Sequence, residues 1–216
     1  LSTVYKRNNK DIYDYFGANS ARSFFRFEFP RFSMFGLRFI KQNIPEIEIL
    51  EYPSWDEYLE KINEQSWDIV GFSFFLNEIH EILEMVKYAR QKGIPELWAG
   101  NYGALTKSIQ KYFDRIFVGY SEDEIAKEFG RRIPKDGLIH PPIVLYTSFH
   151  GIKLNNHGAL YTNRGCNQHC HFCQTPQFCK APSKIPLKSI EDVLRYYKKI
   201  GITEILILDE SFGLYQ

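Results

Sequence analysis

Four cysteines are the residues of this 216-residue chain whose spacing most directly indicates chemistry. All of them lie between Cys166 and Cys179, and the 165 residues before them contain none. A secreted disulfide framework would distribute its cysteines, whereas clustered thiols in an otherwise cysteine-free chain indicate metal or redox chemistry. Cys166, Cys170 and Cys173 form the pattern C-x3-C-x2-C in RGCNQHCHFCQTP, so three thiolates can reach one small centre.

This spacing suits an iron–sulfur cluster, because such clusters take thiolate ligands. A cubane held by only three thiolates keeps one iron with an open coordination position, which makes that iron reactive. Zinc is the competing interpretation, with Cys179, His169 or His171 as a further ligand. Structural zinc sites more often pair C-x2-C with a second, distant pair, so the pattern favours iron. We therefore expect Cys179 and the two histidines to be loop residues outside the site.

Residues 47–129 alternate between short apolar runs and amphipathic stretches, which predicts the framework that precedes the cysteines. The run DIVGFSFF at 68–75 is typical of a strand buried on both faces. Further strands are predicted at 47–52, 96–100 and 114–119, and helices at 79–89 and 104–112 and after Ser54 and Ser121. Because parallel neighbours need crossover connections, we predict an α/β fold with a doubly wound, Rossmann-like parallel sheet in residues 1–135.

A second α/β pattern follows a stretch rich in Pro, Gly and Asn, which predicts a linker at 136–157. The pattern consists of a strand, a helix and a strand, at 158–163, 189–200 and 204–209. Two strands and one helix cannot bury their apolar faces alone. We therefore expect residues 158–216 to be the truncated beginning of a larger domain.

Composition excludes several classes of protein. The charges sum to +1, from 27 basic and 26 acidic residues, so no polybasic surface for nucleic acid is indicated. No apolar run approaches the roughly 18 residues that a membrane span needs. The chain starts without Met and without a basic segment followed by an apolar one, so we expect a fragment of a cytoplasmic protein.

The cysteine pattern resembles the signature of the radical S-adenosylmethionine (radical SAM) superfamily, since the aromatic Phe172, the preceding RGC and the predicted strand before it all agree. The resemblance implies a 4Fe–4S cluster on Cys166, Cys170 and Cys173, with Phe172 beside the cofactor. S-adenosylmethionine would chelate the remaining iron. An electron from a reductant such as flavodoxin or ferredoxin would then give a 5′-deoxyadenosyl radical that abstracts hydrogen from substrate.

The acidic pair Asp209 and Glu210 follows the last predicted strand. In the family this place approaches the amino group of S-adenosylmethionine, often through Gly-Gly-Glu. The two glycines are absent here, but cobalamin-dependent members commonly carry an acidic pair before a Ser/Thr/x-Phe stretch, which Asp209, Glu210, Ser211 and Phe212 resemble. The resemblance implies that Glu210, or second Asp209, binds the ammonium group through a charge-assisted hydrogen bond.

The domain before the cysteines resembles the cobalamin-binding domain of the same family, in which the corrin lies beyond the carboxyl ends of parallel strands. Ser73 and Gly119 stand at two such ends, and Gly100 with Asn101 stands where many members have Gly-Gly. Asn101 and Ser121 depart from the glycine pattern. No D-x-H-x-x-G occurs, so no histidine of that motif would ligate cobalt.

The resemblance implies a cobalamin-dependent radical SAM enzyme that transfers a methyl group to an unactivated carbon of a small-molecule substrate. Methylthiotransferases are the neighbouring subgroup, but their N-terminal domain brings three cysteines of its own, and this one has none. Because the substrate pocket lies largely in later parts of the family's barrel, we expect this chain alone to be inactive. The alternative from another class is a corrinoid-binding or carrier module with a structural zinc site at the cysteines.

Overall fold

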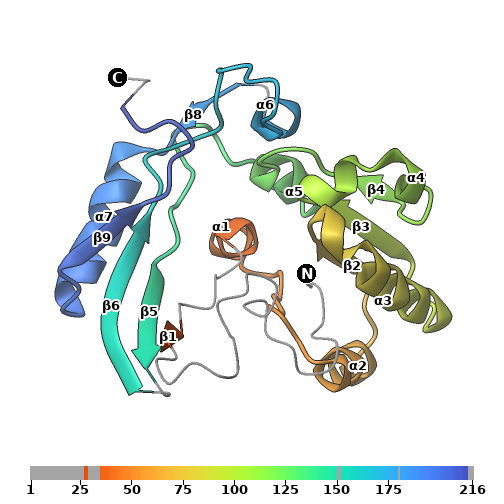
Figure 1. The fold of residues 1–216 in the computed structure, drawn as a ribbon. Helices are drawn as coiled ribbons and strands as arrows, with labels where there is room; N and C mark the ends of the chain where they lie inside the picture. Colours follow the sequence, from red (N-terminus) through yellow and green to blue (C-terminus); the bar gives the residue numbers. More distant parts are fainter. Residues whose placement is uncertain (1–26, 29–34, 150–151, 180, 214–216) are drawn as a thin grey trace. The chain divides into compact units, whose positions relative to one another are not determined.

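The computed structural model describes residues 27–28, 35–149, 152–179 and 181–213. They form two compact units (Figure 1): residues 47–119 make the first, and residues 120–213 join 27–28 and 35–46 in the second. Each unit mixes helices and strands, which confirms the α/β class. In the described part of the chain, no helix has the length and apolar character needed to cross a membrane.

The first unit is built on a parallel sheet of three strands in the order β2-β3-β4. β2 and β3 are in register from the pair Ile69 and Glu96 to the pair Ser73 and Gly100. The predicted strands at 68–75, 96–100 and 114–119 are confirmed. The elements are α2 (Trp55–Glu64), β2 (Ile69–Ser73), η3 (Leu76–Glu78), α3 (Ile79–Gln91), β3 (Glu96–Gly100), η4 (Tyr102–Leu105), α4 (Lys107–Gln110) and β4 (Arg115–Ile116).

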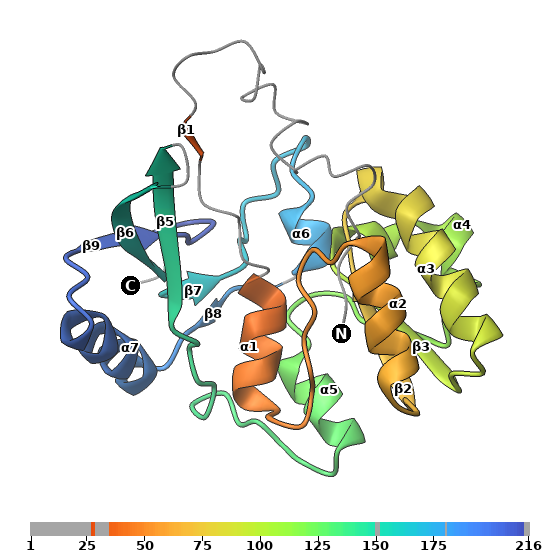
Figure 2. The ribbon, with the colours of Figure 1, turned by 90° about the horizontal axis from the view of Figure 1, so that it is seen from below.

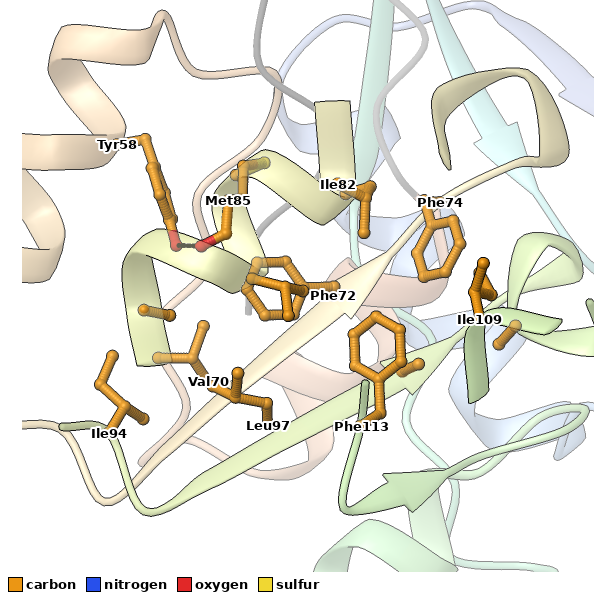
Figure 3. Close-up of a cluster of buried hydrophobic side chains, with 14 of the residues drawn as sticks. Tyr58, Val70, Phe72, Phe74, Ile82, Met85, Ile94, Leu97, Ile109 and Phe113 are labelled. Carbon is orange, nitrogen blue, oxygen red and sulfur yellow. Dashed lines mark hydrogen bonds between the residues drawn. The ribbon is translucent and has the colours of Figure 1, made fainter. Parts of the chain in front are cut away.

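A closely packed apolar core holds helices and sheet of the first unit together (Figure 3). Phe72 on β2, Leu97 on β3 and Met85 on α3 are all nearly inaccessible to solvent. Tyr58 on α2 is buried as well, and its hydroxyl donates to the backbone oxygen of Met85 at 2.8 Å. Burial of a continuous apolar strand on both faces explains why this part of the sequence could be assigned from its pattern.

The strand predicted at 47–52 is not formed; the segment has one isolated bridge residue, Leu50. Tyr52 adopts the left-handed conformation with φ of 48°, and Pro53 after it has no N–H to donate, so a strand cannot continue here. The helix predicted after Ser54 is confirmed. Its capping box is complete, because Ser54 Oγ accepts from Glu57 N at 3.1 Å while the Glu57 carboxylate accepts from Ser54 N.

The second unit contains a four-stranded sheet in the order β1-β5-β6-β9 and a separate pair, β7-β8. β5 and β6 form an antiparallel hairpin, while β6 and β9 are parallel and are connected through α7, which lies beside them (Figure 2). The elements are β1 (Phe27–Glu28), α1 (Phe35–Asn43), α5 (Glu122–Glu128), β5 (Ile143–Phe149), β6 (Ile152–Leu160), β7 (Asn163–Arg164), α6 (Thr175–Phe178), β8 (Ser183–Lys184), α7 (Leu187–Lys199) and β9 (Glu204–Ile207).

The hairpin occupies most of the segment predicted to be a linker. Gly158, the first residue of the strand predicted at 158–163, lies inside β6, and Tyr197 of α7 packs on it: a Cβ there would be 2.7 Å from the Tyr197 ring. The Tyr197 hydroxyl accepts from Ile143 N at 2.8 Å and lies 2.7 Å from Ala159 O, so one side chain ties α7 to both strands. The glycine thus serves close packing, a use that local sequence does not distinguish from a turn.

The division between the units falls at residue 119 rather than at residue 135. Helix α5 groups with the second unit, where Glu122 forms an ion pair with Arg164 of β7. Helix α1 belongs to the same unit, because Asn43 exchanges two hydrogen bonds of 2.8 Å with the backbone of Ile139. Both helices lie within the range 1–135 that the sequence predicts as the first domain.

Candidate functional site

The cysteine loop runs from the end of β7 to the beginning of α6 in the second unit. Cys166 and Cys173 are half-buried, and Cys170 is exposed. A turn closes the second half of the loop, since Cys173 N donates to Cys170 O at 3.0 Å. Phe172 is 93% exposed, so no part of this unit shields its ring.

Backbone and hydroxyl donors already surround two of the three sulfur atoms. Gln168 N donates to Cys166 Sγ at 3.3 Å. The hydroxyl and the backbone N–H of Thr175 donate to the Cys173 sulfur and lower the pKa of that thiol. The contacts from Thr175 stabilise the thiolate form of Cys173, which is the form that ligates metals.

Cys179 has a different environment. Burial raises the pKa of its thiol, which donates to Ala181 O at 3.1 Å. The sulfur also lies against Gly165, where a Cβ would be only 2.6 Å away. Cys179 therefore packs against Gly165, the residue that leads into Cys166, and its place outside the ligand set stays a prediction.

The described residues contain no group of three His, Cys, Asp or Glu side chains already arranged to hold a metal ion. The donors themselves fit an iron–sulfur cluster, because three thiols on one short, largely accessible loop are the ligands such clusters require. Cys166, Cys170 and Cys173 stay predicted ligands.

Asp209 binds the connection between β6 and β7. Its carboxylate accepts from Thr162 N at 2.7 Å and from Asn163 Nδ2 at 2.8 Å, and it also accepts from the Thr162 hydroxyl. A carboxylate that accepts several hydrogen bonds from its own chain has little capacity left for a ligand. Asp209 thus holds the end of β9 against the strand that leads into the loop.

Glu210 reaches the cysteine loop itself. One carboxylate oxygen accepts from Gly165 N at 3.0 Å, and the other accepts from the hydroxyl of Tyr120. Ser211 follows, and its hydroxyl donates to Gly165 O at 3.4 Å. Glu210, the favoured residue for binding S-adenosylmethionine, therefore contacts Gly165, which directly precedes Cys166 in the chain. Glu210 is also exposed, so its free lone pairs are accessible to a further donor.

Arg164 and Glu122 form a buried ion pair that the sequence did not predict. Arg164 Nη1 and Nη2 lie 2.6 and 3.3 Å from the two carboxylate oxygens of Glu122, and both side chains are 5% exposed. The guanidinium is 4.6 Å from the ring centroid of Phe39 and 4.2 Å from that of Tyr120. The sequence offered one signal, an arginine two residues before the first cysteine, but not its partner 42 residues away.

His140 locks the segment that precedes β5 to the end of β6. The ring is almost fully buried; Nδ1 donates to Pro141 O at 2.7 Å, and Nε2 accepts from Tyr161 N at 2.9 Å. Burial lowers the pKa of the imidazole to about 4. The ring is therefore neutral and fixed in one tautomer. Its role is structural, and it does not serve as a proton donor to a substrate.

In the first unit, three of the predicted cofactor-binding residues come together at the carboxyl ends of β2 and β3. Ser73 pairs with Gly100 across the sheet, and Asn101 Nδ2 donates to Ser73 Oγ at 3.3 Å. Asn101 has φ of 70°, the left-handed conformation that favours glycine, which explains why glycine would suit this position. Gly119, with φ of 91°, follows β4 in the same unit.

Comparison with known proteins gives distant relatives. The chain is 24% identical over 152 residues to the ribosomal protein uS12 methylthiotransferases RimO of Psychrobacter arcticus and Psychrobacter cryohalolentis. A shorter match is 41% identical over 58 residues to the cytidylyl-2-hydroxyethylphosphonate methyltransferase of Streptomyces wedmorensis. The first two matches cover 66% of this chain but only 29% and 28% of those enzymes, and the third covers 25% and 10%.

No family model and no solved structure matches the chain. The relatives are group-transfer enzymes by name. Together with the spacing of the three cysteines, these similarities suggest the radical SAM superfamily and an enzyme as the parent protein.

Proposed function

We propose that this chain is part of a radical SAM enzyme that holds a 4Fe–4S cluster on Cys166, Cys170 and Cys173. The observation that carries the proposal is the thiol triplet itself, on a loop between β7 and α6. Similarity to enzymes that transfer methylthio and methyl groups supports it. The cluster and S-adenosylmethionine, when bound, would supply a 5′-deoxyadenosyl radical for hydrogen abstraction.

The residues of the chain would bind and orient these groups. The three thiolates would hold three irons, and Phe172 would offer an apolar face beside the loop. Glu210 would accept a hydrogen bond from the ammonium group of S-adenosylmethionine with the lone pairs that Gly165 and Tyr120 leave free. Asp209 supports the strand end instead, so Glu210 is the better of the two candidates.

We further propose a corrinoid at the carboxyl ends of the first unit's strands, near Ser73, Gly100, Asn101 and Gly119. The three-stranded parallel sheet is compatible with a Rossmann-like domain, and the parallel pair β6 and β9 with the start of a barrel. A corrinoid bound there would supply a methyl group for transfer to an unactivated carbon of a small-molecule substrate. A flavodoxin or ferredoxin would reduce the cluster.

Anaerobic reconstitution with iron and sulfide tests the cluster. The wild-type chain is expected to turn brown, with visible absorption that dithionite bleaches, and each of Cys166→Ser, Cys170→Ser and Cys173→Ser is expected to lower the bound iron. Cys179→Ser is the matched control and should bind as much iron as wild type. A colourless wild-type protein that contains one zinc ion per chain would refute the proposal and favour a structural zinc site.

Methylthio transfer is the second candidate, because the RimO similarity covers two thirds of the chain. The absence of cysteine before Cys166 argues against a second cluster in this region. Two measurements separate the candidates. Iron and sulfide contents that correspond to one 4Fe–4S cluster per chain, together with hydroxocobalamin that stays bound after desalting, support the corrinoid enzyme. Loss of all hydroxocobalamin on desalting, with the iron and sulfide retained, would contradict the corrinoid proposal and leave the cluster proposal in place.

A further inference from the structure

The peptide that leads into Cys166 is held by residues outside the cysteine motif. Gly165, in the left-handed conformation with φ of 86°, donates its N–H to Glu210 at 3.0 Å and accepts the Ser211 hydroxyl at 3.4 Å. Cys179 fills the space where a side chain would stand. Contacts on three sides restrict the backbone next to the first thiol while the loop beyond it is exposed at Cys170.

Tyr120 connects this anchor to the buried ion pair. Its hydroxyl donates to the carboxylate oxygen of Glu210 that Gly165 does not use. Its ring lies 4.2 Å from the Arg164 guanidinium and packs edge-on against Phe178 of α6, with centroids 5.6 Å apart. Arg164 and Gly165 are the two residues before Cys166. Tyr120 contacts the first directly and the second through Glu210, and it also contacts α6, the helix that follows the cysteine loop.

The ion pair in turn fixes Arg164. Glu122 binds the guanidinium through both oxygens, and the Phe39 ring also packs on the guanidinium, with its centroid 4.6 Å away. Tyr120 and Glu122 are neighbours at the start of α5, so one short segment holds both the side chain of Arg164 and, through Glu210, the backbone of Gly165.

We propose that Tyr120 is a positioning residue for the first cluster ligand: it holds the backbone at Gly165 and Cys166 in place before any iron binds. The role in cluster assembly rests on the proposed function, whereas the anchoring is a property of the chain without metal. Formation of the site therefore involves two parts of the loop in different ways. The start of the loop is fixed by side chains, and only the part with Cys170 and Cys173 has to close around the cluster.

Tyr120→Phe tests this role, because it removes the hydroxyl and keeps the ring on Arg164 and Phe178. In the metal-free chain, NMR-detected exchange of the Gly165 amide is expected to accelerate on the order of tenfold, because the Glu210 carboxylate that accepts from Gly165 N loses the hydroxyl that holds it in position. Tyr196→Phe, at an exposed tyrosine of α7, is the matched control and should leave this rate unchanged. Equal exchange rates in Tyr120→Phe and Tyr196→Phe would overturn the proposal.

Cluster assembly gives the second measurement. After anaerobic addition of ferrous iron and sulfide, Tyr120→Phe is expected to assemble several-fold more slowly than wild type and to reach the same electron paramagnetic resonance signal after reduction. Glu210→Gln, which weakens the same contacts from the acceptor side, should accelerate Gly165 exchange as well. Unchanged assembly would refute the positioning role. A wild-type chain that forms no cluster would refute the proposed function, while the exchange rates would still decide the anchoring.

Discussion

Protonation of His140 should make the stability of this protein strongly dependent on pH. The folded chain buries the imidazole and uses Nε2 as an acceptor, so it binds a proton much more weakly than the unfolded chain. The pKa falls from 6.5 to about 4, chiefly through burial. Because the folded pKa is the lower one, the contribution is fully present above pH 6.5 and is lost as the pH falls toward 4.

The magnitude follows from the two pKa values. A difference of about 2.5 pKa units corresponds to about 3 kcal/mol when both states are compared below pH 4. At pH 5 the unfolded imidazole is almost fully protonated and the folded one is not. Roughly 2 kcal/mol of the free energy of unfolding should therefore disappear between pH 7.5 and pH 5 through this one group.

Urea unfolding of wild type and His140→Gln measures this contribution. The glutamine oxygen can accept from Tyr161 N but does not titrate, so the variant should be less stable at pH 7.5 and lose this part of the pH dependence. The difference between the two proteins should narrow by roughly 2 kcal/mol at pH 5. His80→Gln, at an exposed position, controls for the removal of a histidine. A difference that stays constant across this range would refute the reasoning.

Two further substitutions test the packing around the site. Glu122→Ala should lower the free energy of unfolding by about 3 to 5 kcal/mol, because it leaves the buried Arg164 without its partner. Denaturant unfolding measures this loss, and Glu191→Ala, at an exposed glutamate, is the control. Similar losses in the two variants would contradict the prediction. Gly158→Ala should cost about 1 to 3 kcal/mol, since the new methyl group meets the Tyr197 ring at 2.7 Å. Thermal unfolding measures it, and Gly36→Ala, where nothing lies within 4 Å, is the control.

Several features of this protein could be read from the sequence because each depends on residues close together in the chain. The continuous apolar runs predicted β2 and β3, and the spacing of apolar residues with Gly93 after it predicted α3. Ser54 with Glu57 predicted the beginning of α2. The pattern of thiols, and with it the proposed iron–sulfur chemistry, is likewise local: three ligands within eight residues, Cys166 to Cys173.

Tertiary structure decided the rest. Nothing in the sequence indicated a partner for Glu122, and its position beside Arg164 made it the partner of a buried cation. The sequence predicts Gly158 at the start of a strand, but the reason for a glycine there is the Tyr197 ring that occupies the space above it. Both outcomes depend on residues about 40 positions apart, whose proximity is set by how strands pair and helices pack. Periodicity and spacing record the preferences of neighbouring residues, and pairings over such distances leave no mark on them.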